Sequence, residues 1–217
     1  MARTNRLIKI PIALVLLALV AFLFVRSARD SRANPFTVER AQLTGWTLEI
    51  EAASGPSSPL LVLQAPPDFS NGLFRQLFSR AMESLSMPVP AAIPLLLEGE
   101  FDRAFAGRMT PEALLDVARS AGLGAGALQP RCMVYRRVSS PERTRQIYFA
   151  LFDLPAFAAF RAQIGDRLAA GGSAGAAYDP AALSPAMVVA ASDTEFNAWL
   201  PIKADPDKDC LAPIVAN

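Results

Sequence analysis

Three acidic residues, Glu98, Glu100 and Asp102, form a cluster of groups that could act as acids or bases. They alternate along the chain, so on a continuing strand their carboxylates would share one face. Carboxylates held together raise one another's pKa, and such a set can serve as general acid and base or bind a divalent cation. A hydrolase that uses them is one interpretation. The favoured interpretation is a solvated strand edge whose charges discourage aggregation.

The chain contains no histidine. This excludes a Ser-His-Asp triad, a Cys-His pair, an H-E-x-x-H zinc site and histidine-ligated haem. The run 171–175 matches G-x-S-x-G, but it follows an expected helix and is interpreted as a linker-like loop. Asp205, Asp207 and Asp209 resemble the opening of a calcium loop that lacks the required glycine and glutamate. No catalytic residue, cofactor or metal site is predicted.

Five arginines gather in one expected hairpin, whose strands cover 131–138 and 145–152: Arg131, Arg136, Arg137, Arg143 and Arg145. The guanidinium fork suits carboxylates and phosphates. The hairpin is therefore a candidate face for a protein partner or a lipid headgroup. In the alternative interpretation these are exposed strand positions paired with acidic residues of the same domain.

The two cysteines, Cys132 and Cys210, allow two interpretations. A disulfide would tie the C-terminal tail to a central strand, as expected of an exported domain. The alternative is two buried, unpaired thiols. Sequence alone does not decide between them.

The N-terminal region predicts a membrane anchor, because residues 10–25 carry no charge and no hydrogen-bonding side chain. Nineteen helical positions counted from Leu7 would span about 28 Å, close to the ~30 Å hydrocarbon core of a bilayer. The predicted segments are a cytoplasmic tail at 1–9, a transmembrane helix at 10–26 and a juxtamembrane linker at 27–42. The alternative is a cleaved signal peptide that leaves a secreted periplasmic domain.

Charge bears on orientation and on partners. Three lysine or arginine residues lie on each side of the predicted helix, so their number does not set its orientation. The short tail before the helix and the large domain after it favour export of the domain. Of the 21 basic and 20 acidic residues, 15 and 19 lie beyond residue 32, which gives that part a net charge of −4. A mildly acidic domain is not a nucleic-acid binder. Arginine far outnumbers lysine, which indicates a GC-rich bacterial genome.

The pattern of the remaining residues, 43–217, predicts an α+β domain. Strands are expected at 46–51, 60–63, 95–97 and 187–189, together with the hairpin. Helices are expected from Ser70 or Asn71 to about Leu85, from Thr110-Pro111 to Gly122, and after Pro155. The tail beyond Phe196 is expected to be mostly coil.

The expected order is ββαβ-α-ββαβ, in which 43–105 and 130–200 are possible duplicated halves. These features favour a non-enzymatic, single-pass protein of a bacterial inner membrane, with a periplasmic domain that contacts a protein partner. It would act as an accessory or interaction subunit of an envelope complex.

Overall fold

The computed structural model describes residues 15–23, 33–52, 54–81, 83–139, 141–170 and 178–217. The chain divides into two units, Met1–Asn34 and Pro35–Asn217. In the first unit, residues 15–23 are α-helical and expose apolar side chains such as Leu17 and Phe22. The predicted tail at 1–9 and the rest of the predicted 10–26 helix lie outside the described residues. Within the described ranges, no helix has both the length and the apolar character that crossing a bilayer requires.

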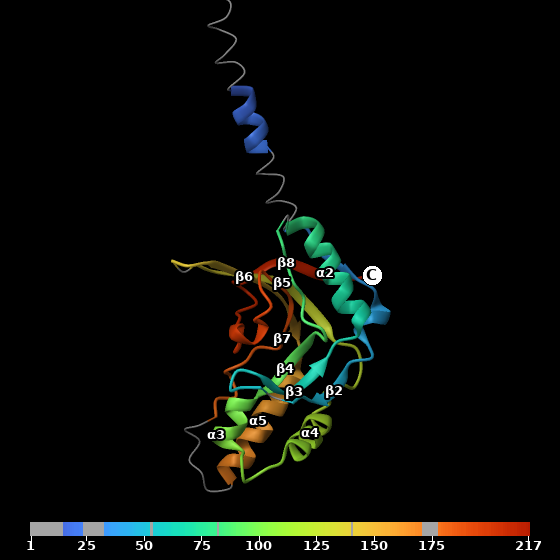
Figure 1. Cartoon of the computed structure of the whole chain (residues 1–217). Helices are drawn as coiled ribbons and strands as arrows, with labels where there is room; N and C mark the ends of the chain where they lie inside the picture. Colours follow the sequence, from blue (N-terminus) through green and yellow to red (C-terminus); the bar gives the residue numbers. More distant parts are fainter. Residues whose placement is uncertain (1–14, 24–32, 53, 82, 140, 171–177) are drawn as a thin grey trace, which may run out of the picture. The chain divides into compact units, whose positions relative to one another are not determined.

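The second unit is a mixed α+β domain with two sheets (Figure 1). The five-stranded sheet has the order β1-β8-β5-β6-β7, with bounds Phe36–Val38, Cys210–Ala216, Gln129–Ser139, Thr144–Asp153 and Ala186–Ala191. The three-stranded sheet has the order β2-β3-β4, with bounds Thr47–Ile50, Pro59–Gln64 and Ala92–Leu97. Strand β4 lies beside β7, where the two sheets meet.

The two sheets share one connectivity. Strands β2, β3 and β4 are antiparallel neighbours, and helix α2 (Pro67–Ala81) connects β3 to β4. Strands β5, β6 and β7 are likewise antiparallel neighbours, and helix α5 (Pro155–Ala170) connects β6 to β7. Two further helices, α3 (Glu98–Ala104) and α4 (Pro111–Ser120), separate the repeated ββαβ units, where the sequence predicts one.

The connecting helices are exchanged between the sheets. Helix α2 packs against β1 and β7 of the five-stranded sheet, although it connects strands of the other sheet. Helix α5 lies with α3 and α4 around the three-stranded sheet (Figure 1). Side chains of both ββαβ units therefore contribute to one common hydrophobic core.

Several helix and strand predictions are confirmed. Helix α4 begins as expected, because the Thr110 hydroxyl accepts a hydrogen bond from the Ala113 N–H at 3.3 Å. It ends before Gly122, which takes a positive φ of 87°. The four expected apolar positions of α5, from Phe157 to Leu168, are all buried.

Other boundaries are wrong. Helix α2 begins at Pro67, ahead of the expected cap, because proline fits the first turn of a helix. Residues 36–42 of the predicted linker belong to the domain, in β1 and in a 3-10 helix η1 (Arg40–Leu43). The expected coil beyond Phe196 contains η2 (Phe196–Trp199) and β8. Strand β1 pairs in parallel with β8, from Phe36 with Ile214 to Val38 with Ala216.

One buried ion pair connects α5 to α3, the helix that follows β4. Arg161 on α5 is fully buried and contacts Glu100, whose side chain is 8% exposed; Arg161 Nη2 lies 2.6 Å from Glu100 Oε1. The Arg161 guanidinium donates its other hydrogen bonds to Glu100 Oε2 and to the carbonyls of Leu95, Asp179 and Pro180. All five N–H donors of the side chain are thereby used.

Replacing Arg161 with methionine is expected to lower the free energy of unfolding by about 3–5 kcal/mol, because the Glu100 carboxylate stays buried without a cation. Arg167→Met, an exposed position on the same helix, is the matched control and should change it by less than about 0.5 kcal/mol. Urea unfolding followed by circular dichroism measures both. Equal stability of the two variants would contradict the assigned role.

A disulfide joins Cys132 of β5 to Cys210 of β8, with Cα atoms 5.7 Å apart and a sequence separation of 78. Cys132 is buried, whereas Cys210 lies at the exposed start of β8. The bond fixes β8 to the central strand, and β8 in turn holds β1.

The double variant Cys132→Ala, Cys210→Ala is expected to lose about 4 kcal/mol of unfolding free energy, because the cross-link restricts a long loop in the unfolded chain. Denaturant unfolding of this variant and of the reduced wild-type protein should give similar losses. A loss below about 1 kcal/mol in both would show that the bond contributes little.

Candidate functional site

The predicted carboxylate face at Glu98, Glu100 and Asp102 does not form, so the strand prediction there is wrong. These residues begin helix α3, and Glu100 accepts a hydrogen bond from the Leu97 N–H at 3.1 Å. Glu98 accepts one from the Gly55 N–H at 2.9 Å, and Asp102 is exposed. The three carboxylates thus point to different partners.

A close approach of two backbones explains why the chain turns into α3 here. The Gly99 N–H donates to the Pro56 carbonyl at 3.0 Å, and a Cβ at residue 99 would lie only 2.7 Å from that oxygen. The loop before β3 therefore packs on the first turn of α3, where only glycine fits.

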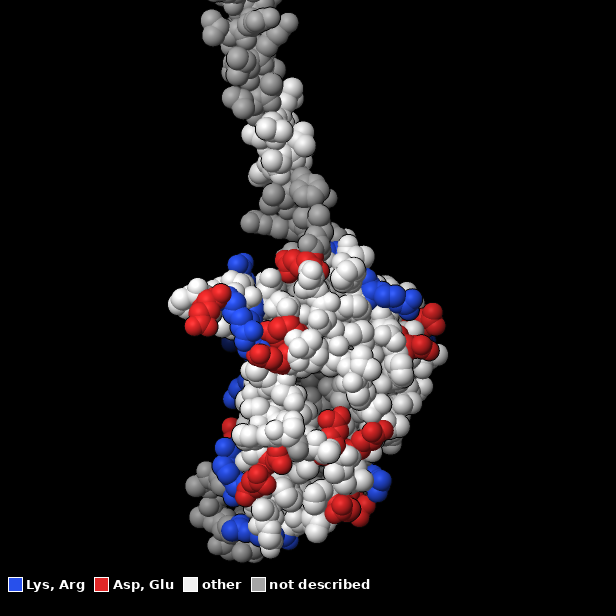
Figure 2. All heavy atoms as spheres, viewed as in Figure 1, with Lys and Arg blue, Asp and Glu red and all other residues white. Residues whose placement is uncertain are grey.

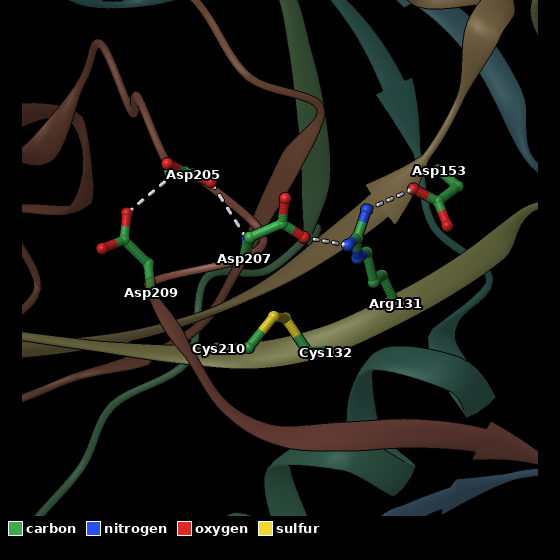
Figure 3. The surroundings of a disulfide bond; sticks show 7 residues. All are labelled: Arg131, Cys132, Asp153, Asp205, Asp207, Asp209 and Cys210. Carbon is green, nitrogen blue, oxygen red and sulfur yellow. Dashed lines mark hydrogen bonds and ion pairs between the residues drawn. A yellow bond between two sulfur atoms is a disulfide. The ribbon is translucent and has the colours of Figure 1, made fainter.

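Arg131 belongs to an ion network beside the disulfide (Figure 3). Its guanidinium lies 2.7 Å from Asp207 and 3.5 Å from Asp153. The Asp205 carboxylate accepts a hydrogen bond from the Asp207 N–H, and the Asp209 carboxylate accepts one from the Asp205 N–H. These aspartates form a hydrogen-bonded turn, and within the part of the chain that the structure describes no group of side chains is placed to hold a metal ion.

Arg136 and Arg137 lie on opposite faces of β5. Arg136 donates to the Lys203 carbonyl, lies 3.6 Å from Asp209 and covers the Phe149 ring at 5.4 Å. The Arg137 side chain is exposed and has no ion pair within the described ranges. One of the two arginines is thus occupied within the domain, and the other faces solvent.

Arg143 and Arg145 hold the segment that contains η2. Arg145 makes a two-pronged contact with Asp193, at 2.6 and 3.2 Å, and lies 5.1 Å above the Trp199 ring. Both arginines also contact the Glu195 carboxylate, at 3.1 Å from Arg143 and 3.4 Å from Arg145. The hydrogen bond from Arg145 lowers the pKa of Asp193 below its ordinary value.

Four of the five hairpin arginines are therefore paired with acidic residues of the same domain. Figure 2 shows this mixture as blue and red side chains next to one another on the projecting hairpin. These four arginines match the alternative interpretation, in which the hairpin arginines pair with acidic residues of the same domain. The partner-binding hypothesis stays a prediction, and the exposed charge that supports it is Arg137.

A small pocket lies where the two sheets meet, and sequence reasoning missed it. Its cavity measures about 90 Å³. The lining comes from the residue after β2, from β3, β4 and β7, from the loop before β4 and from the η2 segment. It consists of Glu51, Pro59, Val62, Pro88, Pro90, Ala92, Pro94, Val188, Phe196, Asn197 and Leu200. We call it the Glu51 pocket. No motif marks it in the sequence, because its walls are separated by more than 100 residues.

Glu51 is the charged residue of this lining. It is half-buried, and among the described residues it has no hydrogen bond to its carboxylate and no ion pair. Burial raises the pKa of Glu51, and the nearby Glu49 carboxylate raises it further. The opposite wall is fixed, because Arg145 holds Asp193 just before η2. The arginine network thus positions one wall of the Glu51 pocket.

Comparisons of the chain with protein-family models, with curated proteins and with solved structures give no match.

The Arg145–Asp193 contact predicts a pH dependence. The folded-state pKa of Asp193 lies below its ordinary value of 3.8, so the contact stabilises the domain above about pH 4 and is lost as the pH falls through the folded-state pKa. Asp193→Asn should therefore cost on the order of 1 kcal/mol at pH 7, and less below pH 4.

Urea unfolding of Asp193→Asn and of the wild-type protein at pH 7 and pH 3 measures this difference. Asp166→Asn, an exposed position on α5, is the control and should match the wild type at both pH values. A cost for Asp193→Asn that is the same at both pH values would contradict the assignment.

Proposed function

We propose that the protein is a non-enzymatic, single-pass protein of a bacterial inner membrane whose domain lies in the periplasm and holds a protein partner. The observation that carries the proposal is the apolar helix at 15–23. Its large side chains are 50–67% exposed on all sides. A helix that is apolar all round requires cover, and lipid supplies it. This helix lies within the uncharged run 10–25.

The disulfide supports the periplasmic location. Disulfides persist in oxidising compartments, which include the bacterial periplasm, and are rare in the cytosol. The Cys132–Cys210 bond joins the last strand of the domain to its centre. Export of the domain, with the short N-terminal tail left in the cytoplasm, agrees with this chemistry.

An interaction role is favoured over catalysis because the carboxylates expected to act together are separated. Glu100 is neutralised by Arg161, and Glu98 and Asp102 face elsewhere. The hydrolase alternative therefore has no shared carboxylate face on which to act. A tethered domain gains local concentration toward partners in the same membrane, which suits an accessory subunit.

A duplicated origin of the domain, with halves 43–105 and 130–200, is part of the proposal. The repeated ββαβ connectivity and the mutual exchange of α2 and α5 support it. Exchange of equivalent elements is a common route by which two copies of a unit become associated.

Membrane attachment is tested by alkaline carbonate extraction of vesicles that contain the full-length protein. The wild-type protein should stay in the pellet. The variant Leu17→Arg, Val20→Arg should appear in the supernatant, because each arginine costs about 2.5–3.5 kcal/mol at the centre of a spanning helix. Leu17→Ala, Val20→Ala is the matched control and should remain in the pellet.

Intact spheroplasts that contain the protein distinguish the other outcomes. Protease added to intact spheroplasts should degrade the domain if it is periplasmic and leave it intact if it is cytoplasmic. Wild-type protein in the carbonate supernatant would overturn the anchor. A mature N-terminus beyond Val25 would favour the secreted domain instead.

A further inference from the structure

We propose that the Glu51 pocket receives one lysine or arginine side chain of the partner protein. The inference deepens the proposed function by naming the chemistry of the contact, and it depends on that function for the existence of a partner. Size, charge, surroundings and rigidity of the pocket each support it.

The size of the cavity selects a single side chain. Pockets for metabolites and cofactors usually measure about 300–1,000 Å³. A cavity of about 90 Å³ has room for only a few water molecules. It can therefore accept the end of one side chain from a surface that docks over it, but not a complete small-molecule ligand.

The charge of the cavity selects a cation. Glu51 is the one charged member of the described lining, and its closest charged neighbour in the strand is another acid, Glu49. A half-buried carboxylate without a counter-charge is stabilised by a cation that donates hydrogen bonds to it. Lysine and arginine also carry apolar stems that pack well along a surface of prolines and valines.

An exposed apolar residue beside the cavity provides a docking surface. Val89, between the lining residues Pro88 and Pro90, is 84% exposed. Apolar contacts around a buried polar anchor exclude water from it and thereby strengthen it. Such an arrangement is typical of a protein interface.

The walls are already in place before binding. Four prolines restrict the backbone on one side. The η2 segment on the other side is held by the contact of Arg145 with Asp193, and Asn197 donates to the Ser58 hydroxyl at 3.3 Å. A preformed pocket loses little conformational entropy when the side chain enters.

The test uses the full-length protein in detergent, labelled with 5-fluorotryptophan and observed by ¹⁹F NMR. The chain has two tryptophans: Trp199 in η2, beside the pocket wall, and Trp46, which is buried in the main core. Trp46→Phe assigns the two signals. N-acetyl-arginine methylamide and N-acetyl-lysine methylamide are the cationic probes, and N-acetyl-citrulline methylamide is the neutral isostere.

A saturable shift of the Trp199 signal is expected with at least one cationic probe, while the Trp46 signal stays fixed. The citrulline probe should bind at least fivefold more weakly. Glu51→Gln should weaken binding of the cation at least fivefold. Glu142→Gln, an exposed position at the hairpin tip, is the matched control and should bind like the wild-type protein.

Two results would overturn the inference: a Trp199 signal that neither cation moves, or cation binding that Glu51→Gln leaves unchanged. Failure here is distinguishable from failure of the proposed function. Loss of the protein from vesicles at alkaline pH would refute the anchor and leave the cation site standing. A stable anchor with no cation binding would refute the pocket alone.

Discussion

The fold depends on how one buried guanidinium is accommodated. Arg161 interrupts the apolar face of α5 at a position without access to water, and an unpaired charge there would prevent packing. Glu100 neutralises it, and three backbone carbonyls complete its hydrogen bonds. The result fixes α5, the end of β4 and the start of α3 in one arrangement. Since α5 belongs to the second ββαβ unit and β4 to the first, this ion pair also fixes the two ββαβ units to one another.

Arginine has a second structural use in the hairpin. Its guanidinium groups lie against acidic residues of the chain that follows β7, a segment with little regular structure of its own. Short backbone segments without ladder partners need side-chain contacts to stay in place. The same segment presents Phe196 and Asn197 to the Glu51 pocket. The hairpin arginines, which the sequence suggests as a binding surface, therefore help to position one wall of the Glu51 pocket.

The sequence predicts elements that local signals define, and misses those that distant pairing defines. Thr110-Pro111 and the apolar period of α5 are local, and both helices form where expected. Strand β1 has three residues and pairs with β8, and β8 contains a proline and pairs with both β1 and β5, so these strands depend on partners that are distant in sequence. The alternation at Glu98–Asp102 fits a strand, but a close backbone contact at Gly99 and the Glu100 cap make a helix. Arg161 lies on the apolar stripe of its helix, a signal that was available in the sequence. The Glu51 pocket gave no such signal, because its lining combines residues from both sheets.

The pairing of the first and last strands determines how the domain responds to mechanical tension. A pull on the chain at Pro35 reaches β1 first, which is held by three residues of pairing with β8 and by the amide of Gln76, whose two atoms bond the Thr37 backbone at 2.7 and 2.9 Å. Once β1 is detached, the force passes along the chain to η1, where the Leu43 carbonyl accepts a hydrogen bond from the Leu128 N–H at 2.9 Å. The disulfide holds β8 to the centre of the sheet after β1 is released, so the edge strand β1 is the first part of the domain to yield to tension.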